Sequence, residues 1–363
     1  MALTEDDVME ALLAVVEPDL GQDLVSAKLI RDVVLTDTSL ALTIALTTPA
    51  TPHQGRLRAL VEGALRPLLG GRTLNLTLLA DPPAGVGKLA NVRHVLGVGA
   101  GKGGVGKSTV AVNLAMALTA AGAKVGILDA DVYGPSVPIM LGLRGKKPTV
   151  NAERKIVAFE AHGVRCISMG FLVADDTAVA WRGPMVGRAV QQFVEDVDWG
   201  PLDYLIVDLP PGTGDVILSL CQALPLTGAV VVSTPQDVAF ADVRRAVKMF
   251  GMLKVPMIGL VENMSWFHCP DNGKKYEIFG PSHSQANCAA EELPFLGQLP
   301  IDLALSANAD AGRPIVVAEP GGLVAENYRA IAGRVASALV RLGVSAEKTQ
   351  AAGAGFFGAR PDA

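Results

Sequence analysis

The stretch GKGGVGKST, residues 101–109, constrains the fold of this chain more than any other part of its sequence. It fits the phosphate-binding pattern Gly-x-x-x-x-Gly-Lys-Ser/Thr, follows the apolar stretch HVLGVGA, and opens a predicted helix. Its glycines let backbone N–H groups turn inward around a phosphate, and the N-terminus of the helix adds a favourable dipole. The motif therefore predicts a nucleotide-binding loop between a strand and a helix.

Each polar residue of this loop has an expected role. Lys107 should reach the β- and γ-phosphates, Ser108 should bind Mg²⁺ through its hydroxyl, and Thr109 should bond the α-phosphate. A glycine-rich turn without chemical meaning is the alternative, but strand, loop, lysine and helix follow one another in the order that the motif requires. The predicted nucleotide-binding residues of the loop are Gly101, Lys102, Gly103, Gly104, Val105, Gly106, Lys107, Ser108 and Thr109.

The rest of the chain indicates two domains. From Val92 onward, short apolar strands alternate with helices, which predicts an α/β domain with a doubly wound, mostly parallel sheet and ligands at the carboxyl ends of its strands. The first 80 residues predict a small α+β domain, with helices over 4–16 and 53–68 and strands over 39–49 and 73–80. The expected boundaries are 1–80 for the small domain, 81–91 for a linker, 92–343 for the α/β domain and 344–363 for a disordered tail.

Composition excludes several classes of protein. Half of the 363 residues are apolar, but no apolar run reaches the ~20 residues of a membrane span, and the acidic N-terminus lacks the basic segment of a secretory signal. The net charge of -5, without a Lys/Arg block, disfavours nucleic-acid binding. Four scattered cysteines are expected to be free thiols. We therefore expect a cytoplasmic protein that binds neither membrane nor nucleic acid.

Acidic residues end two of the predicted strands. GILDADVYG places Asp129 and Asp131 at one strand end, and YLIVDLPPG places Asp208 at another. Phosphoryl transfer to water needs an oriented water and a metal clamp, which carboxylates at such positions can supply. Aspartates at strand ends also cap helices and turns, which is the alternative. We expect Asp131 to orient the water, Asp208 to hold Mg²⁺ through a water molecule, and Asp129 to support them.

Lys102 directly follows the first glycine of the loop, and this second lysine resembles the deviant P-loop ATPases, which include MinD, ParA and the nitrogenase iron protein. The resemblance implies that Lys102 reaches across a homodimer to the nucleotide of the partner and that Asp131 is the switch I aspartate. It also makes Asn263, in LVENM, a candidate for adenine recognition, with the loop at Pro300 as a second one. Otherwise Lys102 is a solvated loop lysine.

Further blocks resemble one family of these ATPases, the Mrp/ApbC-type iron-sulfur cluster carriers. They include DADVYGPSVP (129–138), WRGPMV (181–186) and WGPLDYLIVDLPPGTGD (199–215), and the first 80 residues resemble a PaaD-like small domain. The resemblance implies a homodimer that holds an iron-sulfur cluster between its subunits and passes it to apoproteins, with ATP binding and slow hydrolysis. A Cys-x-x-Cys pair from each subunit would hold the cluster, as suits a [4Fe-4S] centre.

Cys269 departs from that pattern. In SWFHCPDNGKK, Asn272 stands in place of the second cysteine, and Thr51 stands where many relatives of the small domain carry a cysteine. A dimer then offers two thiolates rather than four, and Pro-Asp-Asn-Gly also favours an ordinary turn. Cys166 and Cys221 lie in apolar stretches and are expected in the core. The further ligands weighed for a cluster are His268, Asp271, Cys288 and an external thiol.

Three functions remain open from these observations. The first is an ATP-dependent iron-sulfur carrier with Cys269 as its metal ligand. The second is an Mrp-like ATPase adaptor that holds no cluster, which the missing cysteines suggest. The third is a MinD- or ParA-like positioning ATPase, which needs a membrane-seeking helix or a basic face, and the residues after Val344 offer neither.

Overall fold

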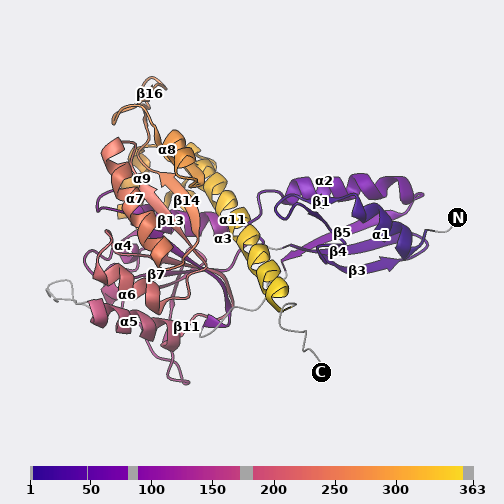
Figure 1. Ribbon diagram of the computed structural model, residues 1–363, viewed down its shortest axis with the longest axis horizontal. Helices are drawn as coiled ribbons and strands as arrows, with labels where there is room; N and C mark the ends of the chain where they lie inside the picture. The colour runs from indigo at the N-terminus through magenta and orange to yellow at the C-terminus, as the bar shows by residue number, and fades with distance from the viewer. Residues whose placement is uncertain (1–2, 47, 81–88, 172–182, 355–363) are drawn as a thin grey trace, which may run out of the picture. The chain divides into compact units, whose positions relative to one another are not determined.

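The computed structural model describes residues 3–46, 48–80, 89–171 and 183–354 (Figure 1). The chain forms two compact units, one of Met1–Pro82 with Ala336–Ala363 and one of Pro83–Val335. Most of the expected linker, residues 81–88, and part of the WRGPMV block lie outside the described residues. Each unit is described by itself.

The smaller unit is built around a sheet of order β3-β4-β5, in which β4 is antiparallel to β3 and parallel to β5. Leu40, Leu42 and Ile44 alternate along β4 and are buried, which is the period of a strand with one face in a core. Its elements are α1 (Glu5–Leu13), β1 (Val16–Glu17), β2 (Gln22–Asp23), β3 (Ile30–Leu35), β4 (Ser39–Leu46), α2 (Gln54–Leu65), the 3₁₀ helix η1 (Arg66–Leu68) and β5 (Thr73–Ala80).

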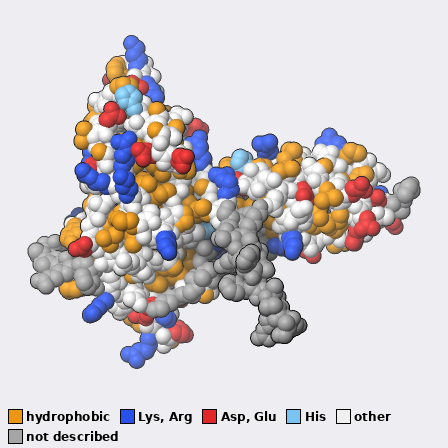
Figure 2. Space-filling view, in the orientation of Figure 1, with side chains coloured by type: hydrophobic (Ala, Val, Ile, Leu, Met, Phe, Trp, Pro, Cys, Tyr) orange, Lys and Arg blue, Asp and Glu red, His pale blue; other side chains and the backbone are white. Residues whose placement is uncertain are grey.

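The residues at the N-terminus of α1 explain why this segment is helical. Thr4 accepts a hydrogen bond from the Asp7 backbone, and the Asp7 side chain accepts one from the Thr4 backbone, so the two residues form a capping box. Acidic side chains gather around α1 in Figure 2, and Glu5, Asp6 and Asp7 lie in its first turn, where the helix dipole favours negative charge. Val8 and Leu12 bury the opposite face.

The larger unit contains an eight-stranded sheet of order β17-β14-β13-β6-β12-β7-β10-β9. All neighbours in it are parallel except β9, which runs antiparallel to β10. The predicted α/β fold with a mostly parallel sheet is therefore confirmed. The strands are β6 (Val92–Gly99), β7 (Val125–Asp129), β9 (Phe159–Ala161), β10 (Val164–Ser168), β12 (Leu202–Asp208), β13 (Gly228–Ser233), β14 (Met257–Glu262) and β17 (Phe295–Gln298), with short pairs β8 (Ile156–Val157) and β11 (Val197–Asp198), and β15 (Phe267–His268) and β16 (Lys275–Tyr276).

Helices pack around this sheet, and every residue of β7, β12 and β13 is buried. Burial on both faces explains why these strands have uninterrupted apolar sequences. The helices are α3 (Lys107–Ala120), α4 (Val137–Met140), α5 (Gly183–Asp196), α6 (Asp215–Ala223), α7 (Asp237–Met252), α8 (Ser284–Ala290), α9 (Leu303–Asp310), α10 (Ile315–Ala318) and the first part of α11 (Leu323–Ala354), with the 3₁₀ helix η3 (Met169–Phe171). The residues of α11 from Ala336 onward belong to the smaller unit.

Helix α11 corrects one expectation. The sequence predicts a disordered tail from residue 344, but α11 continues to Ala354, and residues 355–363 lie outside the described part. Ala, Glu, Lys and Gln in SAEKTQAA have high helix propensity, which favours continuation of the helix through this stretch. No helix in the described ranges is both long and apolar enough to cross a membrane.

Candidate functional site

The loop 101–106 joins the carboxyl end of β6 to the first residue of α3, as the motif predicts. Gly104 and Gly106 have φ angles of 81°, a conformation that strains residues with a Cβ. At Gly101 a Cβ would lie 2.5 Å from backbone and side-chain atoms of Asp242, and at Gly106 it would lie 2.2 Å from Asn263 Nδ2. The glycines therefore allow the loop to pass close to its neighbours as well as to turn.

Lys107 is buried at the start of α3 and is surrounded by oxygen atoms. Its Nζ donates to Asp208 Oδ1 at 2.5 Å and to Ser108 Oγ at 3.1 Å, and it lies 3.5 Å from Asp131 Oδ2. These contacts compensate the positive charge of the buried ammonium group. The lysine expected to bind phosphate is thus held by the carboxylates expected to complete the site.

The sheet brings the predicted carboxylates together because their strands are neighbours. Asp208 ends β12, Asp129 ends β7, and the two are paired in register. Asp131 follows two residues later, and its backbone N–H donates to Asp129 Oδ1 at 3.1 Å. Strand order β6-β12-β7 therefore places the loop after β6 beside all of these acidic residues.

Burial changes the acidity of two of these carboxyl groups. Burial and then the charge of Asp208 raise the pKa of Asp129 to about 8, although a hydrogen bond from Ser168 Oγ at 2.8 Å opposes the rise. Burial also raises the pKa of Asp208, against the attraction of Lys107. Among the described residues, the site therefore holds more acidic groups than its one buried cation, Lys107, can neutralise, and a second cation would relieve this imbalance.

The residues around Ser108 and Asp208 fit a hydrated magnesium ion. Asp208 Oδ2 is buried and accepts no hydrogen bond from the described residues, so it remains an open acceptor. Magnesium prefers oxygen ligands and retains several of its waters, which a hydroxyl and a nearby carboxylate can hold. The donor set is therefore suitable for Mg²⁺ bound beside a phosphate.

Lys102 differs from Lys107 in its surroundings. The residue is exposed, and no hydrogen bond or ion pair of its side chain is found within the described ranges. Its charge is therefore unpaired within the part of the chain that the structure describes. The expectation that Lys102 acts on the nucleotide of a partner stays a prediction.

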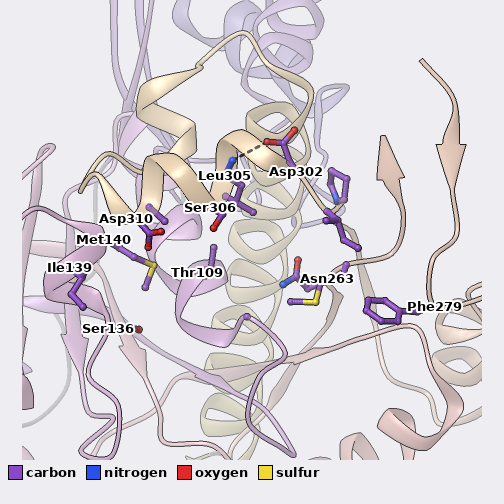
Figure 3. A pocket seen from close by; sticks show the side chains of 15 residues that line it. Thr109, Ser136, Ile139, Met140, Asn263, Phe279, Asp302, Leu305, Ser306 and Asp310 are labelled. Carbon is purple, nitrogen blue, oxygen red and sulfur yellow. Dashed lines mark hydrogen bonds between the residues drawn. The ribbon is translucent and has the colours of Figure 1, made fainter. Parts of the chain in front are cut away.

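A cavity of about 460 Å³ opens beside the loop, and Gly106 and Thr109 are among the residues that line it (Figure 3). Asn263 lies on one side of it, and α4 and α9 contribute the other walls. The volume and the mixture of apolar and polar walls suit a nucleoside attached to phosphates in the loop. The remaining lining residues are Ser136, Ile139, Met140, Met264, Phe279, Pro300, Ile301, Asp302, Leu305, Ser306, Ala309 and Asp310.

Asn263 connects the cavity to the loop. Its Nδ2 donates to the Val105 carbonyl at 2.9 Å, and its Oδ1 is buried without a partner in the described part of the chain. A free amide oxygen can accept from the exocyclic amino group of adenine. Pro300 lines the same cavity, so both sequence candidates for base recognition lie there.

The sequence pattern did not single out the apolar walls of this cavity. Ile139 and Met140 come from a single helical turn, and Leu305 comes from α9. Their residue types are typical of any core, so only the fold shows that they face a cavity. The one sequence feature that could have predicted this wall is Asp302, a residue type that often caps helices. Asp302 caps α9 by accepting a hydrogen bond from the Leu305 backbone N–H at 2.9 Å.

Cys269 begins the turn of the β15–β16 hairpin. Its backbone N–H donates to the Lys274 carbonyl at 3.0 Å, and its carbonyl accepts from Gly273 N–H at 2.9 Å. Asn272 Oδ1 accepts from the Lys274 backbone at 2.9 Å, and Asn272 Nδ2 donates to Tyr276 Oη at 3.0 Å. The turn predicted from Pro-Asp-Asn-Gly is therefore present, and Asn272 stabilises it.

The other cysteines are poor ligand candidates. Cys166, Cys221 and Cys288 are buried, whereas Cys269 is half-buried. Burial raises the pKa of Cys221 to about 12 and that of Cys288 to about 11, so these thiols stay protonated at neutral pH. The described residues contain no group of three or more His, Cys, Asp or Glu side chains that could hold a metal ion within one chain.

Thr51 is buried in the smaller unit. Its hydroxyl donates to Asp19 Oδ2 at 2.6 Å, and His53 Nε2 lies 3.6 Å from Asp19 Oδ1. A threonine at this position therefore satisfies a buried carboxylate, which a weaker thiol donor would do less well.

The parallel sheet, the loop geometry and the buried Lys107–Asp208 pair define a nucleotide-binding protein of the P-loop NTPase class. A family described as NUBPL iron-transfer P-loop NTPase matches residues 91–336, and one described as iron-sulfur cluster assembly protein matches residues 5–75. The chain belongs to the NUBPL-type iron-transfer P-loop NTPases and carries an iron-sulfur assembly domain ahead of the NTPase domain.

Several relatives are similar over nearly the whole chain. The iron-sulfur cluster carrier protein of Deinococcus radiodurans is 48% identical over 332 residues, which cover 90% of this chain and 93% of the relative. The iron-sulfur cluster carrier protein of Synechocystis is 42% identical over 92% of this chain and 97% of the relative. The similarity therefore includes both domains.

Solved structures agree with this assignment. A nucleotide-binding protein in complex with ADP from Archaeoglobus fulgidus is 37% identical and superposes with a TM-score of 0.57, over 65% of this chain and 91% of its own. The cell division ATPase MinD of Pyrococcus furiosus, at 21% identity and a TM-score of 0.51 over 67% of this chain and 98% of its own, shares the fold.

Proposed function

We propose that this chain carries iron-sulfur clusters to apoproteins as a homodimer that binds ATP and hydrolyses it slowly. The observation that carries the proposal is the position of Cys269, the half-buried cysteine of the chain, on a hairpin of the same unit that contains the nucleotide loop. The similarity to iron-sulfur cluster carrier proteins over both domains supports it.

ATP is proposed to bind with its phosphates in loop 101–109 and its adenosine in the adjoining cavity. Asn263 Oδ1 would accept from the adenine amino group, and Lys107 would exchange its carboxylate partners for phosphate oxygens. Mg²⁺, held by Ser108 and through water by Asp208, would supply charge neutralisation for the phosphates. The strong negative charge of the triphosphate compensates Lys107 for the contacts that it gives up.

For hydrolysis, Asp131 is proposed to orient the attacking water. Lys107 lies 3.5 Å from Asp131 Oδ2, so movement of the lysine towards phosphate would free this oxygen to accept from water. Lys102, exposed and without a partner in the described part of its own chain, would stabilise charge on the nucleotide of the other subunit. One lysine then acts within the subunit and the other across the dimer.

In this proposal the iron-sulfur cluster is cargo that the protein delivers, and not a permanent cofactor. Two copies of Cys269 supply two thiolates, and Asn272 belongs to a hydrogen-bonded turn, so it is not a further ligand. A [4Fe-4S] centre takes four ligands, and the remaining two would come from outside the pair of Cys269 thiolates, such as a small thiol or the recipient. Cargo held by two protein thiolates is easier to release than cargo held by four.

Anaerobic reconstitution with iron and sulfide tests the proposal. The wild type should bind iron and show visible absorption from thiolate-to-iron charge transfer, and Cys269→Ala should lose most of both. Cys221→Ala is the matched control, because that thiol is buried with a pKa of about 12 and should not contribute. A wild type without iron, or a Cys269→Ala protein with as much iron, favours the ATPase adaptor without a cluster.

Asn272→Cys extends the same experiment. It restores the Cys-x-x-Cys spacing in a turn where Asn272 is exposed, so it should raise the amount of iron retained after desalting. Asn272→Ser removes the amide without adding a thiol and is the control. Equal iron retention in these two variants would mean that the hairpin does not hold the cluster.

A further inference from the structure

A second cavity, of about 430 Å³, lies in the larger unit and shares no lining residue with the nucleotide cavity. It lies along the edge strand β17, between α8 and α11. It is lined by Trp266, Gln285, Phe295, Gly297, Gln298, Asn327, Ala330, Ile331 and Arg334. Neither the proposed nucleotide chemistry nor the proposed cluster chemistry uses this cavity.

Arg334 places an oriented positive charge at this cavity. Its Nη1 donates to the Leu296 carbonyl at 2.6 Å, which orients the guanidinium group. Within the described residues, no Asp or Glu forms an ion pair with Arg334, and the cavity lining contains no acidic side chain. The remaining N–H groups of an arginine oriented in this way match the two oxygens of a carboxylate.

Two amide side chains add one donor and one acceptor. Gln298 Nε2 donates to the buried Glu262 at 2.9 Å, so the Gln298 carbonyl oxygen is the end left to accept from a ligand. Ser282 donates to the other oxygen of Glu262 at 2.6 Å, which keeps this carboxylate in place. Asn327 Nδ2 is a buried donor without a partner in the described part of the chain.

Trp266 forms a rigid wall of the cavity. Lys275 Nζ lies 3.9 Å from the centre of its indole ring, and the Trp266 carbonyl accepts from Ile301 N–H at 2.6 Å. The ring offers a flat apolar surface on which backbone or small side chains can pack. The cavity therefore combines an anion-binding group, a free donor, a free acceptor and an apolar wall.

We propose that this cavity binds the carboxylate end of a short peptide. Arg334 and Asn327 would donate to the terminal carboxylate, Gln298 would accept the adjacent peptide N–H, and Trp266 would cover the chain. Inorganic phosphate fits less well, because it has no apolar part that could pack against Trp266. The volume lies near the lower end of the roughly 300–1,000 Å³ typical of ligand pockets and suits two or three residues.

Isothermal titration of the full-length protein with triglycine tests the proposal, with triglycinamide, glycine and inorganic phosphate as the comparison ligands. Triglycinamide removes the terminal charge and glycine removes the peptide N–H. The variants are Arg334→Gln and Asn327→Asp, which places a negative charge beside the carboxylate. Arg329→Gln is the matched control, because Arg329 on the same helix also donates to a backbone carbonyl, that of Pro320 at 2.6 Å, but does not line the cavity.

Triglycine should bind with a dissociation constant on the order of 1 mM, and both cavity variants should weaken it about tenfold or more. Arg329→Gln should bind like the wild type, and triglycinamide, glycine and phosphate should bind at least about tenfold more weakly than triglycine. Each variant is checked for folding by its thermal transition. The proposal is overturned by no saturation below ~10 mM, by equal binding of triglycinamide, glycine or phosphate, or by an equal loss in Arg329→Gln.

Discussion

The ammonium group of Lys107 lies 2.5 Å from Asp208 Oδ1, although the two residues are 101 positions apart in the chain. Adjacent parallel strands β6 and β12 create this pair, because one precedes the phosphate loop and the other ends in the aspartate. In the proposed mechanism, phosphate binding replaces this contact by contacts between Lys107 and phosphate oxygens. Folding and nucleotide binding would then both depend on one buried ion pair.

Removal of Lys107 should affect stability and binding together. Lys107→Met leaves the buried Asp208 without its cation, so the free energy of unfolding without nucleotide should fall by about 3 kcal/mol. ATP binding should also be lost. Urea denaturation and titration with ATP measure the two effects, and Lys124→Met, at an exposed lysine, is the control. A Lys107→Met protein that is as stable as the wild type would contradict the role given to this pair.

Lys102→Ala should separate binding from turnover. The side chain is exposed and has no partner in the described part of its own subunit, so its removal should leave ATP affinity within about twofold of the wild type. Hydrolysis that depends on protein concentration should fall by about a thousandfold, as for loss of an arginine finger. Lys147→Ala, at another exposed lysine, controls for surface charge. Normal turnover in Lys102→Ala would exclude the action across the dimer.

Gly101 allows the loop to approach α7. In Gly101→Ala the new Cβ would lie 2.5 Å from the Asp242 backbone, so the loop must shift, at a cost of about 1–3 kcal/mol in stability. Gly103→Ala is the matched control, because nothing lies within 4 Å of a Cβ at that position. Thermal unfolding without nucleotide compares the two variants. Equal transition temperatures would show that the close approach does not constrain the loop.

His94 should make stability depend on pH. Burial and then the charge of Arg93 lower the pKa of His94 to about 4, so the unfolded chain binds a proton between pH 6.5 and 4 that the folded protein does not. Stability should therefore fall as the pH drops through this range, by up to about 3 kcal/mol from His94 alone. His94→Phe retains the aromatic ring stacked on Tyr204 and should fall less steeply. Parallel curves from urea denaturation would contradict this contribution.

The sequence alone predicted those elements whose local pattern is compatible with a single structure. Residues 101–109 predicted the turn between β6 and α3, and the apolar strand ahead of Asp208 predicted a buried parallel strand. Leu202–Asp208 is buried throughout, so its continuous apolar sequence was enough to predict the strand.

Other elements could not be read in this way. The strand β17, Phe295–Gln298, is four residues long and lies between prolines, so the stretch is too short to show a hydrophobic periodicity. The strand β3, Ile30–Leu35, carries the charged residues Arg31 and Asp32, which obscure its strand pattern. It forms because it pairs with β4, which the local sequence does not show. The Gln298–Glu262 and Asn263–Val105 contacts join residues 36 and 158 positions apart, beyond any local pattern.

Transfer of a cluster tests the central claim most directly. The protein, reconstituted anaerobically and desalted, is mixed with apo-aconitase, whose activity returns only when it receives a [4Fe-4S] cluster, and Cys221→Ala and Cys269→Ala are compared under the same conditions. We predict that the wild type and Cys221→Ala restore activity and that Cys269→Ala restores little more than free iron and sulfide do. Equal restoration by Cys269→Ala, or none by the wild type, would contradict the account.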